Sequence, residues 1–155
     1  MTDGCWCMWW RQRTGNRERN KQAMKELVDG GREPGLLAYE SAVPVGWVSI
    51  GPREEFGQLV RSRIYRPVDE EPGAWSIVCF YVHPSAKRHR VATALLGAAV
   101  EHALTRGARA IEAYPRDQPD YMGVKTSLER LGFEAARPAG KRTVMRRAIR
   151  PSRRK

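Results

Sequence analysis

The sequence predicts an α/β (or α+β) fold, in which a mixed sheet carries helices on its faces. Three observations lead to this prediction. A nearly continuous apolar run at 75–82 (WSIVCFYV) is typical of a central strand covered on both faces. A helical pattern follows at 91–106, and another strand pattern at 108–114. Strand, helix and strand in this order form a right-handed crossover between parallel strands.

A helix and a hairpin are expected before the central strand. Residues 16–29 carry apolar side chains at helical spacing, with Asn16 as the N-cap and Gly30-Gly31 as the stop. Two strands joined by a short polar turn indicate an antiparallel hairpin. The hairpin strands and a short helix are expected at 36–39, 45–50 and 53–61.

The crossover helix 91–106 ends at Gly107, which is a typical residue for the end of a helix. Pro115 ends the strand that follows it. The remaining elements are a helix at 120–131, ended by Gly132, and two strands at 133–137 and 142–148.

Length and composition favour one domain over residues 1–150. The chain has 155 residues, 41% of them hydrophobic and 29% charged, which is a globular balance. No apolar run approaches the roughly 20 residues of a membrane span. The start, MTDGCWCMWW, lacks the pattern of a secretion signal, so we expect a cytoplasmic protein without a membrane partner. Residues 1–15 form an irregular entry segment rich in aromatic residues and cysteine, and 151–155 form a basic tail.

The net charge of +11, from 28 Lys and Arg against 17 Asp and Glu, attracts anions. Nucleic acid, an acidic membrane and a polyphosphate cofactor all fit this charge. A specific nucleic-acid partner ranks last, because the basic residues form no recognition helix or stacking motif. We interpret the last basic run as a solvated tail. It comprises Arg146, Arg147, Arg150, Arg153, Arg154 and Lys155.

The three cysteines, Cys5, Cys7 and Cys79, do not predict a disulfide framework, because their number is odd and no secretion signal precedes them. Cys5 and Cys7 could supply two thiolates to a metal, but no nearby residues supply the other two ligands of a structural zinc site. We therefore expect no metal. Cys79 lies in an apolar strand, where burial makes a thiol unreactive.

The loop before the crossover helix is a candidate anion site. The first turn of a helix has unpaired backbone N–H groups and the positive end of the helix dipole. Amides of residues 88–93, the Thr93 hydroxyl and the cations Lys87, Arg88 and Arg90 would meet a diphosphate there. The alternative is a surface turn that is basic only because the whole chain is basic.

The segment 82–96 (VHPSAKRHRVATALL) resembles the acyl-CoA signature of the GNAT (Gcn5-related N-acetyltransferase) superfamily, whose loop reads Arg/Gln-x-x-Gly-x-Gly/Ala. The corresponding residues here are 87–92 (KRHRVA). Segments 45–52 and 127–133, the latter ending in Gly-Phe, resemble a strand and a helix of the same family. The resemblance extends over 16–148. It implies a mixed, mostly antiparallel sheet with a parallel strand pair around the acyl-CoA site.

The resemblance also implies an activity: direct transfer of an acetyl group from acetyl-CoA to a primary amine of a small molecule or a protein. Residues 115–120 and 53–73 would line the acceptor side. The acidic side chains there could attract a cationic amine, although a solvated surface is the simpler interpretation. The implied cofactor-binding residues are Phe80, Tyr81, Val82, Lys87, Arg88, His89, Arg90, Val91, Ala92 and Thr93.

The catalytic residues are candidates only. We predict Glu112 as general base, with His83 second. For the general acid we predict Tyr121 or Tyr81, and Tyr114 is a further candidate. Each of these tyrosines could instead be a core or rim aromatic, and the glutamate could face solvent.

The chain departs from the family pattern at three places. Arg90 stands where the loop usually has glycine, so it must adopt helical geometry or swing aside to clamp a phosphate. Leu128 stands where a tyrosine acid is usual. We expect the usual first strand and helix to be missing, which would leave one sheet edge bare. The entry segment would cover that edge, or a second copy would pair with it to make a homodimer. A catalytically weak or inactive acyl-CoA-binding module is therefore the alternative function.

Overall fold

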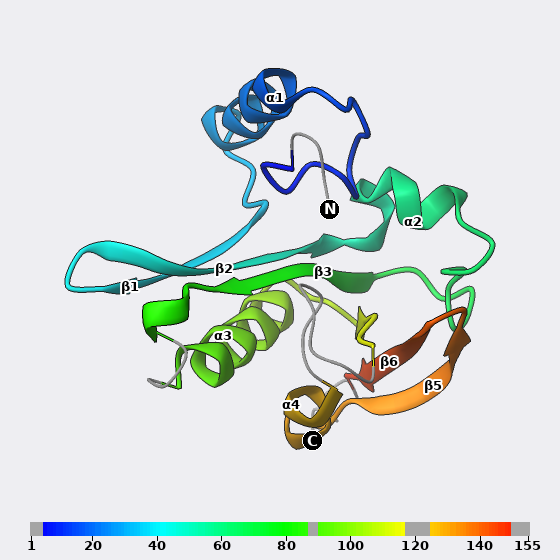
Figure 1. Cartoon of the computed structure of the whole chain (residues 1–155). Coiled ribbons are helices and arrows are strands. Elements are labelled where there is room, and N and C mark those ends of the chain that lie inside the picture. The colour runs from blue at the N-terminus through cyan, green and yellow to red at the C-terminus, as the bar shows by residue number, and fades with distance from the viewer. Residues whose placement is uncertain (1–4, 87–89, 117–124, 150–155) are drawn as a thin grey trace.

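In the computed structural model, which describes residues 5–86, 90–116 and 125–149, six strands form one mixed sheet (Figure 1). Their order is β1-β2-β3-β4-β6-β5, and only the pair β3–β4 is parallel. The predicted α/β fold, with a mostly antiparallel sheet and one parallel pair, is thus confirmed. The strands are β1 (Gly35–Glu40), β2 (Val43–Pro52), β3 (Ala74–Val82), β4 (Ala110–Ala113), β5 (Glu134–Ala139) and β6 (Arg142–Ala148).

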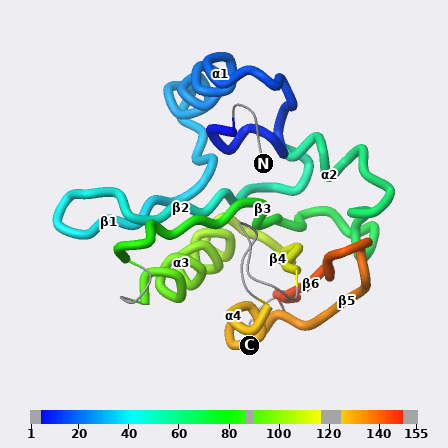
Figure 2. The backbone as a smooth tube through the Cα atoms, in the orientation of Figure 1, coloured from blue at the N-terminus to red at the C-terminus, as the bar shows by residue number. Residues whose placement is uncertain are grey.

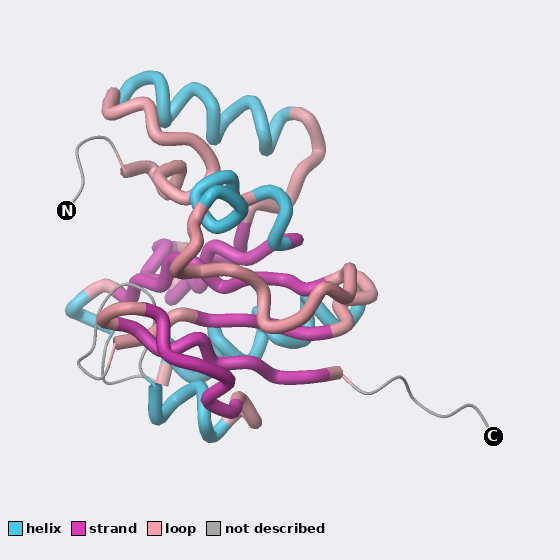
Figure 3. Tube along the Cα trace, turned by 90° about the vertical axis from the view of Figure 1, so that its right-hand side faces the viewer, coloured by secondary structure: helices cyan, strands magenta, loops and turns pink. Residues whose placement is uncertain are grey.

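The helices match the predicted order and cover both faces of the sheet (Figure 3). They are α1 (Arg17–Asp29), α2 (Gly57–Arg61), α3 (Val91–Thr105) and α4 (Lys125–Arg130), with 3-10 turns η1 (Arg53–Glu55) and η2 (Pro84–Ala86). The predicted short helix at 53–61 is therefore two pieces, η1 and α2. Across the described ranges, every helix is too short or too polar to span a bilayer.

The first helix begins and ends where its caps predict. The Asn16 side chain accepts a hydrogen bond from the Arg19 N–H at 2.9 Å, which satisfies one of the free donors of the first turn. At the other end Gly31 has a φ of 75°, a left-handed conformation that favours glycine. The hairpin that follows is antiparallel, with Gly35 opposite Ser49.

Helix α3 buries one apolar face of the sheet. Leu95, Leu96 and Ala99 are buried against Ile50 and Ile77, at the centre of the largest apolar cluster. Leu128 of α4 belongs to the same cluster and is fully buried. Helices α3 and α4 therefore share this face, which Figure 1 shows below the sheet.

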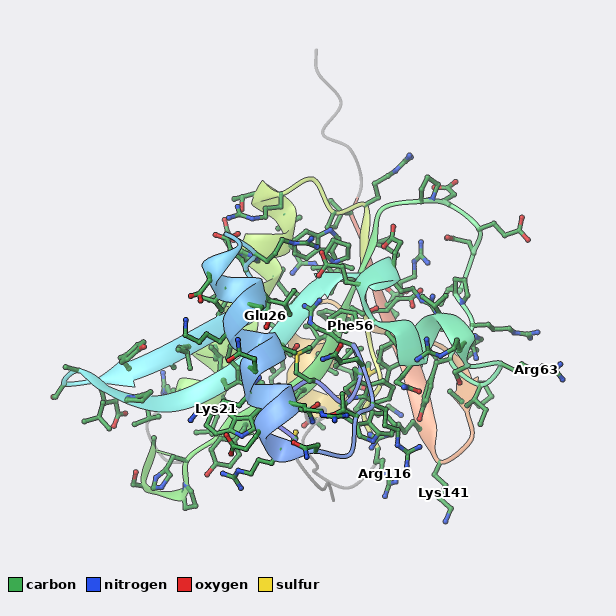
Figure 4. The ribbon with its side chains drawn as sticks, turned by 90° about the horizontal axis from the view of Figure 1, so that it is seen from above. Lys21, Glu26, Phe56, Arg63, Arg116 and Lys141 are labelled. Carbon is green, nitrogen blue, oxygen red and sulfur yellow. The ribbon has the colours of Figure 1, made fainter. Side chains whose placement is uncertain are left out.

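The opposite face is covered by α1, α2 and the entry segment (Figure 2). Figure 4 shows α1 crossing above the β1–β2 hairpin. Trp10 is buried in a second cluster with Phe56, Leu59 and Tyr114. The entry segment therefore packs on a face of the sheet, and our prediction that it covers the bare edge is wrong.

In the part of the chain that the structure describes, the sheet ends at β5 on one side and at β1 on the other. Among the described residues only β2 pairs with this strand. Leu37, Tyr39 and Val43 in the hairpin are 50%, 59% and 58% exposed. Pairing with a second copy at this edge stays a prediction.

Two further expectations are corrected. The strand expected at 108–114 is shorter, because β4 covers only Ala110–Ala113. Arg146 and Arg147 are not part of a solvated tail but lie in β6, opposite Glu112 and Ile111 of β4. The run was misread because more basic residues follow it in the sequence and because Glu112, the buried partner of Arg146, is distant in sequence.

Candidate functional site

A bulge in the central strand coincides with the point where its parallel partner ends. Ser49 of β2 lies opposite Cys79, but Ile50 lies opposite Ile77, so Val78 is one extra residue in β3. Such a bulge bends the strand. The pairing of β3 with β4 ends at the same place, at Ile77 opposite Ala113. The two parallel strands therefore separate beyond Ile77.

The separation leaves backbone groups of β3 without a strand partner on the β4 side. The His83 N–H donates to the Val45 carbonyl at 2.7 Å, so this amide points toward β2. Alternate residues of an antiparallel strand point their backbone groups to opposite sides. The N–H and C=O groups of Phe80 and Val82 therefore point away from β2. No strand among the described residues pairs with them there.

The amino end of α3 lies beside the end of β3. Val91, the first residue of the helix, packs with Val45, Val82 and Ala86 in a small apolar cluster. The N–H groups of the first helical turn have no acceptor within the helix. The structure thus brings the unpaired edge of β3 and the positive end of α3 to one corner of the molecule, as predicted for Phe80, Val82 and Val91.

Arg90 does not adopt the helical geometry that was the first of our two alternatives, and the second, a side chain that clamps a phosphate, stays a prediction. Arg90 precedes α3 with φ 59° and ψ 12°, in the left-handed region, and its side chain makes no capping hydrogen bond to the helix. A left-handed residue other than glycine costs about 1–2 kcal/mol. Arg90 thus occupies the backbone conformation for which glycine is suited. Its neighbours Lys87, Arg88 and His89, predicted as cofactor contacts, lie outside the described residues.

Glu112 is fully buried at the centre of a polar network on the face opposite α3. Its carboxylate accepts hydrogen bonds from the Tyr114 hydroxyl at 3.1 Å, the Val68 N–H at 3.3 Å and Arg146 at 3.3 Å. Arg53 approaches the second oxygen at 3.7 Å. Buried charges need this degree of pairing. The carboxylate therefore stabilises the sheet, and this structural role does not depend on a catalytic one.

The tyrosine candidates lie in different environments. Tyr114 is fully buried, with its hydroxyl 2.9 Å from Ser76 Oγ, and burial raises the pKa of this hydroxyl. This hydroxyl is therefore a poor proton donor to a leaving group. Tyr81 is 53% exposed, opposite Trp47 in the sheet. Tyr121 lies outside the described residues.

His83, the second candidate base, is exposed at the end of β3. Its Nδ1 lies 2.8 Å from Ser85 Oγ and 3.3 Å from the Ser85 N–H. The ring thus organises the turn η2 that leads toward α3.

The acidic side chains of the expected acceptor side are mostly paired with arginines. Glu55 pairs with Arg11 and Arg32, and Asp69 pairs with Arg146 at 2.5 Å. Figure 4 shows Arg116 and Lys141 close to each other at one end of the molecule. These pairs reduce the negative charge that a cationic acceptor would meet. No three His, Cys, Asp or Glu side chains in the described ranges gather into a metal site.

Sequence reasoning missed the bulge at Val78 and the network around Glu112. The bulge leaves no signal in a continuous apolar run, because both faces of the strand are apolar there. The network joins residues up to 93 positions apart, from Arg53 to Arg146, and no local pattern marks such pairs.

Comparison with known proteins matches residues 5–133 to the acetyltransferase (GNAT) family. Similar solved structures include the ribosomal-protein-alanine N-acetyltransferase of Brucella melitensis, with 20% identity, a TM-score of 0.58 and coverage of 86% of this chain and 79% of that one. The PaiA N-acetyltransferase of Thermoplasma acidophilum, solved with coenzyme A, has 12% identity, a TM-score of 0.55 and coverage of 96% and 88%.

A GNAT family acetyltransferase of Brucella melitensis, solved with acetyl-CoA, has 14% identity, a TM-score of 0.53 and coverage of 96% and 77%. At these identities the structural likeness establishes the fold. None of the curated proteins compared with the chain matches it.

Proposed function

The chain belongs to the acetyltransferase (GNAT) family, and from this premise we propose that it transfers the acetyl group of acetyl-CoA directly to a primary amine. The observation that supports this most is the bulge at Val78, since β3 separates from β4 there and leaves unpaired backbone groups. The same corner holds the amino end of α3. These two features suit the two ends of a long thioester cofactor.

Acetyl-CoA would supply an activated acetyl thioester. The backbone groups of Phe80 and Val82 suit the pantetheine arm, because an extended amide chain can pair with a strand edge as another strand would. The amides of Val91, Ala92 and Thr93 suit the diphosphate at the helix start. Arg90 adds a positive charge beside them, and we propose the same role for Lys87, Arg88 and His89.

During transfer, negative charge develops on the carbonyl oxygen of the acetyl group. The Phe80 or Val82 N–H would donate a hydrogen bond to it. We propose Tyr81 as the residue that protonates the leaving thiolate, since its side chain is half exposed on β3, whereas the Tyr114 hydroxyl is buried. Tyr121 keeps its predicted role as the other candidate acid. Glu112 keeps its predicted role as general base, exerted on the amine through water.

An acyl-CoA-binding module with little catalysis is the second candidate. Leu128 occupies the position where the resemblance places the acid, and it is buried in the apolar cluster under α3. Arg90 replaces the glycine of the loop. Both observations are compatible with binding that is kept while catalysis is weak.

Two measurements test these proposals. Acetyl-CoA and desulfo-CoA should both raise the thermal midpoint, because a ligand that binds only the folded state stabilises it. No shift with either ligand would overturn the cofactor proposal. Release of free thiol from acetyl-CoA across a panel of amines then separates enzyme from binding module. Binding without thiol release would favour the module.

A Tyr81→Phe variant tests the proposed acid. The variant removes the hydroxyl and keeps the ring, so acetyl-CoA should raise its midpoint as in the parent chain. We expect thiol release to slow by at least about ten-fold. A general acid typically contributes about 100-fold to 10,000-fold to the rate, so this expectation is a lower bound. An unchanged rate would exclude Tyr81 as the acid and favour Tyr121.

A further inference from the structure

Three free cysteines meet where the entry segment crosses the central strand. The Cys7 Sγ donates to the Sγ of Cys79 at 3.5 Å, although the two residues are 72 positions apart. The Cys5 side chain is hydrogen-bonded to Cys7. All three thiols are free, and Cys79 is buried in β3. A disulfide has a sulfur–sulfur distance of about 2.0 Å, so the first pair needs a shift of roughly 1.5 Å to bond.

The entry segment is anchored on both sides of Cys7, before it by Trp6 and after it by Trp10. Before it, the Trp6 ring lies against two cations of α1, with Arg17 at 5.5 Å and Lys21 at 5.4 Å from the ring centroid. After it, Trp10 is buried in the second apolar cluster. Such anchors on both sides give the two sulfurs a high effective concentration toward each other.

The backbone at Cys7 supports the same conclusion. Trp6 and Cys7 have φ values of 27° and 55°, in the region that residues other than glycine rarely adopt. Backbone in this region persists only where the surrounding structure fixes it. The contact between Cys7 and Cys79 is therefore part of a defined conformation of the segment.

We propose that Cys7 and Cys79 form a redox modification site, at which an organic hydroperoxide converts the two thiols into a disulfide bridge. One sulfur attacks the terminal peroxide oxygen, the O–O bond breaks, and an alcohol leaves together with that thiol's proton. The resulting sulfenic acid is then attacked by the second sulfur, and its hydroxyl leaves as water with the second proton. The peroxide is reduced by two electrons, one from each sulfur.

The surroundings of Cys7 make this reaction slow. The hydrogen bond from Cys5 lowers the pKa of the Cys7 thiol, but the contact with Cys79 and burial outweigh it and raise the pKa to about 12. The thiolate is the reactive form, so little of Cys7 reacts at neutral pH. We therefore expect the bridge under sustained oxidant, with a rate that rises with pH.

The bridge would tie the entry segment to the central strand across 72 positions. A cross-link over so long a loop restricts the unfolded chain strongly. The thermal midpoint should therefore rise on the order of 5–10 °C in the oxidised protein. A reductant should remove this rise.

Peptide mapping tests the assignment. The whole chain is treated with tert-butyl hydroperoxide, its remaining thiols are alkylated, and tryptic peptides are compared without and with reductant. We expect residues 1–11 linked to residues 64–87, with an alkyl group on Cys5, and loss of the link on reduction. A link through Cys5, or alkylation of both Cys7 and Cys79 after oxidation, would overturn the proposal.

Two variants test which cysteine forms the bridge without relying on the assignment of linked peptides. Cys5→Ser should keep both the linked peptide and the rise in midpoint. Cys7→Ser should lose both, and its site in the entry segment leaves the core strand untouched. A midpoint rise that survives in Cys7→Ser would show that another bond, or none, is responsible.

Discussion

The two faces of the sheet are stabilised by different means. The face under α3 is apolar throughout, with Leu96, Ile77 and Ile111 almost without exposure. The opposite face carries a buried carboxylate, Glu112, between Arg53 and Arg146. An apolar face tolerates substitutions that conserve side-chain volume, whereas a buried charge network depends on every partner. The comparison indicates that the second face is the more sensitive to substitution.

The largest effect is expected for Glu112→Gln. The change leaves Arg53 buried without its carboxylate, while Arg146 is half-buried and keeps Asp69. Breaking a buried pair costs about 3–5 kcal/mol. Urea unfolding measures this loss, with Glu101→Gln on the exposed side of α3 as the matched control. A stable Glu112→Gln protein that binds acetyl-CoA but releases no thiol would contradict the view that the polar face is the more sensitive to substitution. It would show that the Glu112 carboxylate acts as the proposed general base but is not needed for stability.

On the apolar face, Leu96→Ala should cost about 3 kcal/mol. The side chain is 1% exposed, and the substitution removes buried methyl groups and leaves a cavity. Leu37→Ala in the exposed hairpin is the control and should change stability by less than about 0.5 kcal/mol. Equal losses in the two variants would contradict the assignment of α3 to the core.

A third substitution addresses the loop that connects β3 to α3. Arg90→Gly should stabilise the fold by about 1 kcal/mol, because glycine adopts the left-handed conformation without strain. The midpoint of thermal unfolding measures the gain. Arg90→Ala removes the same charge and keeps the strain, so it should not be stabilised. If both variants gain equally, charge repulsion and not backbone conformation is the cause.

The smallest effect concerns pH. Burial raises the pKa of Glu55, but hydrogen bonds and charge from Arg11 and Arg32 outweigh it and lower this pKa below the ordinary 4.5. The pair therefore stabilises the fold above that value, and the contribution is lost as pH falls through the lowered pKa. Because the pair is partly exposed, we expect less than about 1 kcal/mol.

Urea unfolding between about pH 7 and pH 3 measures this term. In Glu55→Gln the decrease of stability on acidification should be smaller than in the parent chain. Glu54→Gln, at the exposed neighbouring position, is the control for the substitution itself. Identical pH profiles for the parent and Glu55→Gln would contradict the pKa argument.

The sequence predicted the apolar face better than the polar one, for a physical reason. Helical spacing of apolar residues predicts helix 91–106, and a continuous apolar run predicts strand 75–82. Asn16 and Gly31 mark the two ends of a helix, because their side-chain and backbone properties suit those positions. The partners of Glu112 come from η1, a loop and β6, so only the tertiary structure brings them together. The sequence could therefore name Glu112 as a candidate but not predict its surroundings.

The corner that holds the candidate site was predicted in part. The strand end and the helix start were located correctly, because Pro84 and the helical pattern mark them. The left-handed backbone of Arg90 was not predicted, since an arginine carries no local signal for it. The bulge at Val78 was missed because both faces of β3 are apolar there, so an extra residue does not disturb the pattern.

The outer edge of β1 has a consequence for handling the protein. Its exposed Leu37 and Tyr39 lie beside backbone groups that another strand can join, and little in the hairpin discourages such a contact. The net charge of +11 then becomes the main force that keeps copies apart. Salt shortens the reach of that repulsion to about 10 Å at 0.1 M. Colloidal stability should therefore be highest in dilute buffer and decline as ionic strength increases.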